Sequence, residues 1–502
     1  MSSAGLMPDA RPAVGTPPPT PADDPALDWL LGGLPRNDMG NAERAIGRFG
    51  RDLIFCPEMG WLAWIGTHWS LERGTQLANL IVQRTAELIN AELAARQDPT
   101  RYPADDTVWP AKEQGAHLAW AVATGDVRRL NGMLRVMEHR LTIAPRALDA
   151  DAWILPVANG TLELRSTAAS ADGGIAFREH RRDDLTTRSA PVAYDREATC
   201  PKTMAWLQHM QPDPEIRLFM QRAAGYALTG TTGEQCAFLF LGEGANGKST
   251  FVNLIRGVLG DYAGTLPVET LLEDERGRSG SQAAPELSRL TGVRVVFAAE
   301  PEKKRRLSTS AIKSMASGEP MLVRELNKPF FELDVQFKVI MSFNRRPQVP
   351  TEDEGMWRRL RLVPWPVIIP KDDRIPDLHL RLLREEAPGI LNWMLDGLRV
   401  WKETGLAAPE AVLAATDSYR QDQDPIGEFL GDVTMAMPSA SVTAADLYRA
   451  YQRWCTRNAQ EPLHMRTFGR TLGDRGIVRG KSSIIIYRGI TLRAEWQPPY
   501  DD

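Results

Sequence analysis

The apolar and polar positions of the first third of the chain predict a small mixed region. "IFCPEMGWLAWIGTHWSL" (54–71) places aromatic and apolar residues between glycines, which is typical of a short hairpin. In "TQLANLIVQRTAELINAELAAR" (75–96) apolar residues recur every three or four positions, and this spacing predicts an amphipathic helix. A further strand pair is expected in "WILPVANGTLELR" (153–165), with Asn159 and Gly160 as its two-residue turn.

The middle of the chain changes from helical patterns to separate apolar runs. "TMAWLQHM" (203–210) and "PEIRLFMQRAAGYALTG" (214–230) read as helices, the second stopped by its final glycine. Apolar runs follow at "FLFL" (238–241), "GVRVVFAAE" (292–300), "QFKVIMSFN" (336–344) and "RLRLVPWPVII" (359–369). Because longer segments separate these runs, they are interpreted as buried strands of an α/β sheet.

The last part of the chain is predicted to be helical and then to end in a small separate unit. "DLHLRLLREEAPGILNWMLDGLRVWKETG" (377–405) reads as helix. The final unit contains "TAADLYRAYQRWCTRN" (443–458), "HMRTFGRTLGDRG" (464–476) and "SSIIIYRGITL" (482–492). Helix, turn, helix and hairpin in this order predict a winged helix-turn-helix.

Composition limits the classes of protein without selecting one. The 502 residues carry a net charge of −4, so a DNA-binding surface would need locally concentrated positive charge. The four cysteines lack metal-binding spacing, and reduced thiols in a cytoplasmic protein are expected. Neither a membrane-spanning run nor a signal peptide is evident. The proline-rich residues 1–26 are expected to be a disordered tail.

One stretch predicts a bound nucleotide. In "FLFLGEGANGKST" (238–250), Gly242, Gly247, Lys248 and Ser249 fit the pattern G-x-x-x-x-G-K-[ST], between an apolar strand and an apolar-periodic helix. Glycines let backbone N–H groups turn inward, and the helix N-terminus adds partial positive charge. Lys248 would contact the β- and γ-phosphates and the Ser249 hydroxyl would bind Mg²⁺, so a nucleoside triphosphate is the expected ligand.

Two polar residues at strand ends are candidates for water activation. Glu300 closes "VRVVFAAE" and could polarise the attacking water and assist the Mg²⁺ shell, although Ala299 stands where a second acid often lies. Asn344 closes "QFKVIMSFN", where its amide could orient water against the γ-phosphate. The alternatives are an exposed strand-end glutamate for Glu300 and a turn-capping amide for Asn344.

Arg358 and Arg359, in "EGMWRRLRLVPW", are candidates for a guanidinium that reaches the γ-phosphate of a neighbouring subunit. A surface arginine pair is the alternative for either residue.

Basic residues suggest two DNA contacts. "MLVRELNKPFFEL" (321–333) reads as a hairpin in which Lys328 and Arg324, with Lys313 at the base, could grip phosphates of a single strand; a solvated hairpin is the alternative. The run 303–306 is expected to be a solvated loop. Residues 465–493 carry seven basic residues and one acid. DNA binding through Arg466, Arg470 and Lys481 is favoured there over a protein-docking module.

Primase chemistry is not expected. Asp149 and Asp151 form a D-x-D pair that could suggest a two-metal polymerase site. However, the chain shows neither a second acid cluster nor zinc-spaced cysteines.

With these motifs in order, the chain resembles the superfamily 3 helicases, and within them the phage and plasmid primase–helicase group related to satellite-phage and poxvirus primase–helicases. The supporting stretches include "NGTLELR", "QRAAGYALTGTTGEQCAFLFLGEGANGKST", "LTGVRVVFAAEPE", "IKSMASGEPMLVRELNKPFFEL" and "SFNRRPQVP". The resemblance implies an AAA+-like hexameric ring with ATP sites between subunits and DNA in its pore.

The resemblance also implies roles for individual residues. The Walker A loop would be Gly242, Glu243, Gly244, Ala245, Asn246, Gly247, Lys248, Ser249 and Thr250. Glu300 would end Walker B, Asn344 would be sensor 1, and the arginine finger would be Arg358 or Arg359. The segment 312–333 would be the additional motif between Walker B and sensor 1.

The expected fold class is therefore α/β: an AAA+-like P-loop NTPase core with an N-terminal α+β accessory region, a helical collar and a C-terminal winged helix. The expected domains are a tail (1–26), an accessory domain (27–198), a collar (199–235), an ATPase core (236–370), a helical extension (371–420) and a winged helix (421–502).

The expected function is ATP- and Mg²⁺-dependent DNA unwinding during replication of a phage or plasmid in the cytoplasm of a bacterial host. The expected form is a homo-hexamer, and a separate primase is a candidate partner. Three alternatives stay open: a DNA-binding initiator or scaffold that uses ATP only to assemble, a bifunctional primase–helicase, and a small-molecule P-loop kinase. The kinase alternative is less favoured, because a small-molecule kinase would have no use for the basic C-terminal unit.

Overall fold

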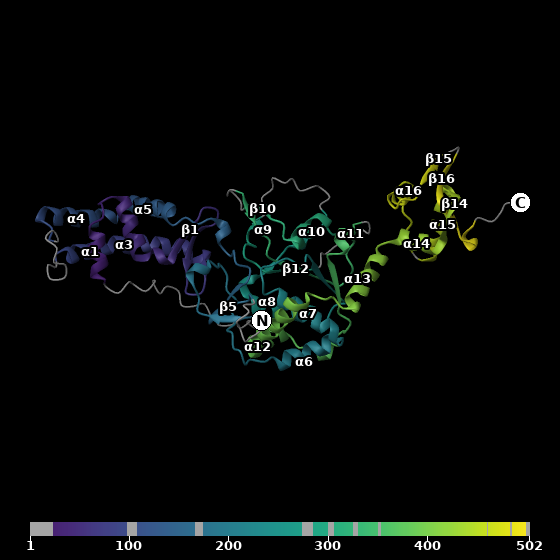
Figure 1. Ribbon diagram of the computed structural model, residues 1–502, viewed down its shortest axis with the longest axis horizontal. Helices are drawn as coiled ribbons and strands as arrows, with labels where there is room; N and C mark the ends of the chain where they lie inside the picture. Colours follow the sequence, from purple (N-terminus) through teal and green to yellow (C-terminus); the bar gives the residue numbers. More distant parts are fainter. Residues whose placement is uncertain are drawn as a thin grey trace, which may run out of the picture.

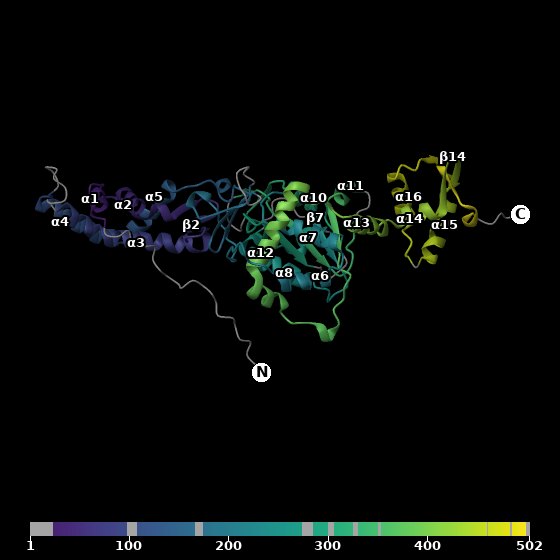
Figure 2. The same cartoon turned by 60° about the horizontal axis from the view of Figure 1, so that its bottom comes forward.

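The structure is a computed structural model that describes residues 24–97, 108–165, 174–273, 285–299, 306–324, 330–349, 353–458, 460–481 and 484–497. The chain forms three bodies in a row: N-terminal helices, a central body around a parallel sheet, and a C-terminal unit beyond helix α13 (Figure 1; Figure 2). The expected tail lies almost wholly outside the described residues.

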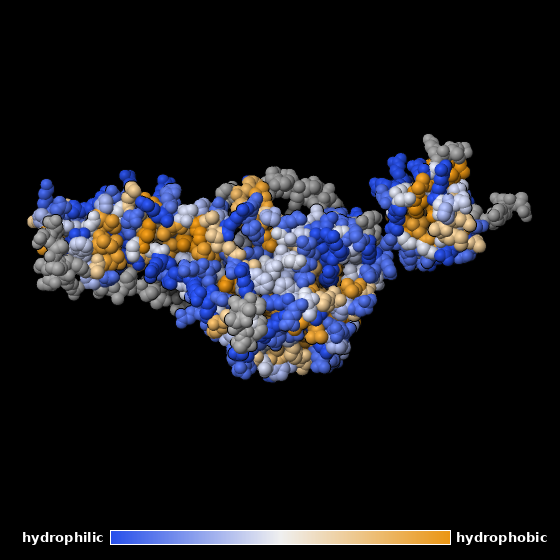
Figure 3. Space-filling view, in the orientation of Figure 1, coloured by the Kyte–Doolittle hydropathy of each residue, from blue (hydrophilic) through white to orange (hydrophobic). Residues whose placement is uncertain are grey.

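The N-terminal body is a helical bundle with a small sheet at one end. Its helices are α1 (Pro25–Gly32), α2 (Asp38–Phe49), α3 (Leu71–Arg96), α4 (Ala111–Thr124) and α5 (Val127–Arg140). Its strands are β1 (Leu53–Cys56), β2 (Gly60–Trp64) and β3 (Trp69–Ser70). The predicted hairpin and the long amphipathic helix are thus confirmed. Apolar side chains also reach the surface here, and Figure 3 shows orange areas on this body. The exposed apolar residues include Leu30, Met39 and Leu80.

The next sheet corrects one prediction. Strands β4 (Ile154–Val157), β5 (Gly160–Glu163) and β6 (Ala176–Arg178) are antiparallel, and Val157 pairs with Gly160. The two-residue turn is therefore Ala158-Asn159, not Asn159-Gly160. The Asn159 side chain holds this turn in place, because its Oδ1 accepts from Tyr194 N (2.8 Å) and its Nδ2 donates to Tyr194 O (2.9 Å).

The central body contains a five-stranded parallel sheet in the order β13-β7-β12-β9-β8. The strands are β7 (Ala237–Leu241), β8 (Ala263–Thr265), β9 (Val295–Ala299), β12 (Lys338–Phe343) and β13 (Leu360–Pro364). Four of them match the predicted apolar runs. The edge strand β8 was missed because three small or polar residues leave no apolar signal. Strand β13 stops at Pro364 rather than residue 369, because Pro364 and Pro366 cannot donate to a ladder.

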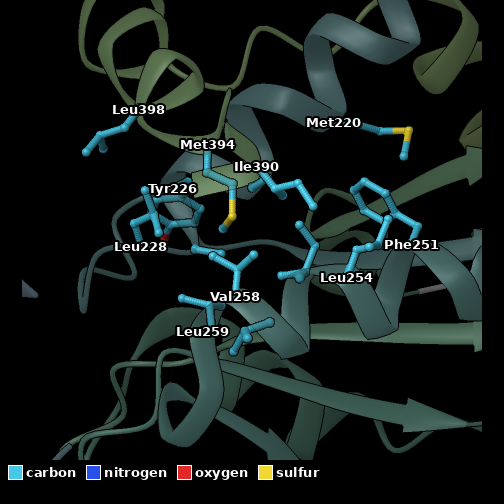
Figure 4. Packing of buried hydrophobic residues seen from close by; sticks show 14 of the residues in the cluster. Met220, Tyr226, Leu228, Phe251, Leu254, Val258, Leu259, Ile390, Met394 and Leu398 are labelled. Atoms are coloured by element: carbon cyan, nitrogen blue, oxygen red, sulfur yellow. The ribbon is translucent and has the colours of Figure 1, made fainter. Parts of the chain in front are cut away.

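One face of the sheet is covered by helices that come before, between and after its strands in the sequence. These are α6 (Pro201–Met210), α7 (Pro214–Tyr226), α8 (Lys248–Leu259) and α12 (Leu378–Thr404), and their buried side chains meet in one cluster (Figure 4). Helix α7 ends at Tyr226, earlier than the predicted glycine stop. The backbones of helices α7 and α12 lie in direct contact at Gly225. A Cβ atom added there would lie only 2.1 Å from Leu398 N, so the contact requires glycine.

Two buried cations join the sheet to the segments that precede it. Arg294 donates to the carbonyl oxygens of Leu228 and Ile154, and Lys338 donates to that of Thr229. Both side chains are almost fully buried, and burial lowers the pKa of Lys338 well below its ordinary value. Carbonyl oxygens replace the water that these cations lose, so the sheet and the preceding region form one packed body.

On the other side of the sheet lie α10 (Thr309–Ser317), α11 (Glu354–Trp357) and a hairpin of β10 (Met321–Val323) and β11 (Phe331–Leu333). The predicted hairpin is confirmed as a strand pair, while its tip at 325–329 lies outside the described residues.

The C-terminal unit follows α13 (Glu410–Asp422). It consists of α14 (Pro425–Val433), β14 (Thr434–Thr443), α15 (Ala444–Arg457), α16 (Met465–Asp474), β15 (Arg479–Lys481) and β16 (Ile485–Leu492). Its antiparallel sheet has the order β14-β16-β15. The predicted helices and hairpin are present, whereas α14 and β14 were not anticipated. In the described part of the molecule, no helix combines the length and apolar character that crossing a membrane requires.

Candidate nucleotide-binding site

Three adjacent parallel strands end at the same edge of the central sheet. Strand β12 lies between β7 and β9, with Phe343 opposite Leu241 and Ser342 opposite Ala299. The residues that follow these strands are Gly242, Asn344 and Glu300. The sheet therefore brings Asn344 beside the glycine loop. Glu300 lies outside the described residues, although β9 ends immediately before it.

The loop between β7 and α8 has an unusual backbone. Gly244, Ala245 and Gly247 all have positive φ angles, of 36°, 51° and 83°. Successive left-handed residues turn backbone N–H groups toward a common concavity that suits an anion. Ala245 adopts this conformation against the preference of an L-residue, and such strain is concentrated at functional sites. Helix α8 begins at Lys248, so its N-terminal partial positive charge points at the same place.

Lys248 is held across the loop by neutral oxygen atoms. Its side chain is buried, and Nζ donates to Gly242 O (2.5 Å), Asn246 Oδ1 (3.1 Å) and Asn344 Oδ1 (3.2 Å). Asn344 Oδ1 also accepts from Gly244 N at 3.2 Å. Asn344 is thus hydrogen-bonded to both the loop and its lysine.

The arrangement fits a Mg²⁺–nucleoside triphosphate. Glu243, Gly244 and Ala245 are exposed, and a Cβ atom added at Gly244 would meet nothing within 4 Å, so space lies over the loop. Ser249 is exposed in the first turn of α8, where its hydroxyl could bind a metal ion. Among the described residues, no cluster of three or more metal-ligating side chains competes for a divalent ion.

The two candidate arginines have different surroundings. The guanidinium of Arg359 donates to Ser317 Oγ (2.8 and 3.2 Å) and to Gly355 O (2.9 Å), which ties it to α10 and α11 of its own subunit. Arg358 is exposed at the mouth of a cavity of about 150 Å³ between α11, β13 and α13. Its side chain makes no ion pair within the described part of the chain, so Arg358 alone is available to another molecule.

The hairpin residues show a similar contrast. Lys313 Nζ lies 2.9 Å from Asp353 Oδ2, and the hydrogen bond from Lys313 holds the pKa of the Asp353 carboxyl below its usual value. The Arg324 guanidinium lies over the ring of Phe330, 4.5 Å from its centroid. Lys328 lies outside the described residues. Lys313 and Arg324 therefore both have local partners, a carboxylate for Lys313 and an aromatic ring for Arg324.

In the C-terminal unit, helix α16 separates basic from apolar positions. Phe468 and Leu472 are buried, whereas Arg466 and Arg470 are exposed. Both exposed arginines lie on the face turned away from the core. Lys481 ends strand β15, and nothing is described of its side chain.

The D-x-D pair has a structural explanation. Asp149 is buried, and its carboxylate accepts from Thr187 N (2.8 Å) and Thr187 Oγ1 (2.5 Å). Asp151 caps Trp153 N at 3.0 Å and pairs with Arg165 at 3.1 Å. Protein groups thus already bond to both carboxylates.

Sequence reasoning missed one wall of the loop. A Cβ atom at Gly247 would lie 3.0 Å from Met210 Sδ and 3.1 Å from Trp206 Cζ2, both on α6. Ile369 N donates to Ala245 O at 2.8 Å, so the segment after β13 lies along the loop as well. The amphipathic pattern of α6 indicated a helix but carried no signal of this contact.

Three family models match the chain. They are described as "D5 N terminal like" (residues 42–212), "Family of unknown function (DUF5906)" (240–359) and "Poxvirus D5 protein-like" (421–475). The first and third confirm the resemblance to primase–helicases that the motifs indicated.

Similar curated proteins are named helicases or primases. "Putative helicase L207/L206" of Acanthamoeba polyphaga mimivirus is 27% identical over 62% of this chain and 34% of its own length. "Putative primase C962R" of African swine fever virus is 25% identical over 64% of this chain and 35% of its own length. The chain thus spans about a third of the length of these relatives. A solved structure of the NrS-1 C-terminal region covers 66% of this chain and 94% of its own, with 11% identity and a TM-score of 0.37.

Proposed function

We propose that this chain, which resembles the viral and phage primase–helicases, is an ATP-dependent DNA helicase that works as a ring in the replication of a phage or plasmid. The observation that carries the proposal is the hydrogen-bonded group at the sheet edge: Lys248 at the start of α8, bonded to Asn344 at the end of the adjacent strand. A phosphate-binding lysine and a strand-end amide at this distance suit cleavage of a triphosphate rather than binding alone.

The chain's own residues would divide the chemistry as follows. Backbone N–H groups of residues 242–250 and the ammonium of Lys248 would hold the phosphates, while Ser249 would bind Mg²⁺. The metal ion, when bound, neutralises charge that develops on the phosphate oxygens. Asn344 would exchange its bond to Lys248 for one to the attacking water, and Glu300 would polarise that water.

A ring would complete the site and connect it to DNA. Arg358 is exposed and makes no ion pair with another described residue, so it suits contact with the triphosphate of a neighbouring copy. The β10–β11 hairpin, with Lys328 at its tip, would contact a single strand in the pore. The exposed arginines of α16 would contact duplex DNA. Because every subunit of the ring would contribute the same basic groups, the phosphate contacts would add up although the chain is net negative.

The first experiment compares wild-type protein with Lys248→Ala in ATP hydrolysis and in unwinding of a forked duplex, both with Mg²⁺. We expect hydrolysis that single-stranded DNA stimulates in the wild type, and at least a 100-fold loss in the variant, because an ammonium in contact with the transferred phosphoryl group is removed. The melting temperature of the variant serves as the control for folding.

The outcomes separate the main alternatives. ATP hydrolysis without unwinding would favour an initiator or scaffold. Normal turnover by Lys248→Ala would contradict the assignment of the loop. Primer synthesis by the purified chain would favour a bifunctional primase–helicase.

A further inference from the structure

The proposed phosphate loop is flanked by a second, partly apolar wall to which the sequence patterns assigned no role. One side of it is α6, whose Trp206 and Met210 touch the position of Gly247. Helices α6 and α8 lie together on the same side of the sheet in both ribbon views (Figure 1; Figure 2). The positive φ angle of 83° at Gly247 and these close contacts both disfavour a larger residue there.

The other side of this wall is the segment 364–369. It is fastened to the end of β7 and to the loop, because Trp365 N donates to Leu241 O (2.7 Å) and Ile369 N donates to Ala245 O (2.8 Å). Gln211, the residue after α6, donates from Nε2 to Pro364 O at 2.9 Å. This bond ties the two sides of the wall to each other.

The wall combines exposed apolar surface with an N–H donor that makes no hydrogen bond to the described residues. Trp206 and Ile369 are only partly buried, so part of each side chain faces outward beside the loop. The indole N–H of Trp206 is shielded from water and has no hydrogen-bond partner among the described residues. A shielded donor without a partner destabilises the protein unless a ligand satisfies it.

A nucleobase matches these properties. Its flat faces favour contact with an aromatic ring, and its edge carries nitrogen and oxygen acceptors for an N–H donor. Once the phosphates occupy the loop, the rest of a nucleotide must extend over one of the neighbouring elements, and α6 contacts the loop at its last glycine.

We propose that α6 and the segment 364–369 form the nucleobase end of the site, with Trp206 contacting the base directly. This inference rests on the proposed binding of nucleotide at the loop. It assigns base recognition to a helix that precedes the phosphate loop by about 40 residues in the sequence.

The test compares a ligand that has a base with one that lacks it. ADP and inorganic pyrophosphate are titrated by calorimetry, with Mg²⁺, into the wild-type protein, Trp206→Ala and Trp206→Phe. We expect Trp206→Ala to weaken ADP binding about 5- to 150-fold, the range for loss of an aromatic–base contact, and to leave pyrophosphate binding unchanged. Trp206→Phe keeps a ring but removes the donor, and should weaken ADP binding about 2- to 10-fold.

A matched control is Trp120→Phe. It removes an indole N–H that donates to Asn41 Oδ1 at 3.0 Å in the N-terminal body. This variant should bind both ligands as the wild type does.

Three results would overturn the inference: unchanged ADP affinity in both Trp206 variants, an equal loss of ADP and pyrophosphate affinity, or a loss in Trp206→Phe that exceeds the loss in Trp206→Ala. If Trp206→Ala does not fold, the comparison of ADP with pyrophosphate in Trp206→Phe decides by itself. Wild-type protein that binds neither ligand would contradict the proposed function instead, so the two failures are distinguishable.

Discussion

At the scale of single residues, two adjacent side chains of the same type have different surroundings. Arg358 and Arg359 are adjacent, yet Arg359 is fixed by Ser317 and Gly355 while Arg358 is exposed. A guanidinium that must reach another subunit cannot also be bound within its own. We therefore infer that Arg358 is the arginine finger.

Substituting each arginine separately tests this inference. Arg358→Ala should lower the rate of ATP hydrolysis by about 10³–10⁵, the range for loss of an arginine finger, with an unchanged melting temperature. Arg359→Ala should destabilise the protein by about 1–3 kcal/mol, because it leaves Ser317 and Gly355 without their donor. The measurements are steady-state ATPase assays and thermal unfolding.

Mixing inactive variants shows whether the finger acts between subunits. A subunit with Lys248→Ala still presents Arg358, and a subunit with Arg358→Ala still has an intact loop. Mixed rings should therefore regain part of the ATPase activity. No recovery on mixing would contradict action across a subunit boundary.

At the scale of elements, the β10–β11 hairpin is the candidate link between hydrolysis and DNA. Its strands pair Met321 with Leu333 and Val323 with Phe331. Val323 and Leu333 are buried against the core, so the base of the hairpin is fixed. An element fixed at its base and basic at its tip can transmit a movement of the core to a bound strand.

We expect Lys328→Ala to keep its basal ATPase activity but to weaken binding of single-stranded DNA. Each phosphate contact that is lost should reduce the slope of log affinity against log salt by about 0.7. Lys313→Ala is the matched control, because Lys313 is paired with Asp353 and its loss should alter stability more than the salt slope. Unchanged unwinding by Lys328→Ala would remove the hairpin from the mechanism.

At the scale of the whole molecule, the three bodies are suited to different interactions. The central body carries the proposed nucleotide site, and helix α13 connects it to the C-terminal unit (Figure 1). That unit has its own apolar core around Phe429, Tyr451 and Trp454. If this unit binds duplex DNA as proposed, its local basic charge would serve without a basic surface on the core.

The double variant Arg466→Ala/Arg470→Ala should weaken duplex binding and reduce its salt slope by up to about 1.8, that is, about 0.9 for each phosphate contact. Hydrolysis of ATP without DNA should not change, because both side chains are on α16. Arg449→Ala, an exposed arginine of α15 paired with Asp446 at 3.1 Å, is the control. Equal effects of the control and the double variant would argue against a specific role for α16.

The sequence by itself determined the local features of this protein. The phosphate loop, the four apolar strands of the core, the long helix α3 and the β10–β11 hairpin were all predictable, because glycine spacing and apolar periodicity depend on neighbouring residues. The turn at Ala158-Asn159 differed by one residue from its prediction, since a contact of Asn159 with distant Tyr194 sets the register.

Only the tertiary structure decided which distant residues meet. The strand order brings Asn344 to Lys248, packing places Trp206 beside Gly247, and local hydrogen bonds separate Arg359 from Arg358. Sequence patterns do not predict these meetings, because strand order and helix packing depend on contacts between segments far apart along the chain. The loop could therefore be predicted from sequence, while its partners could not.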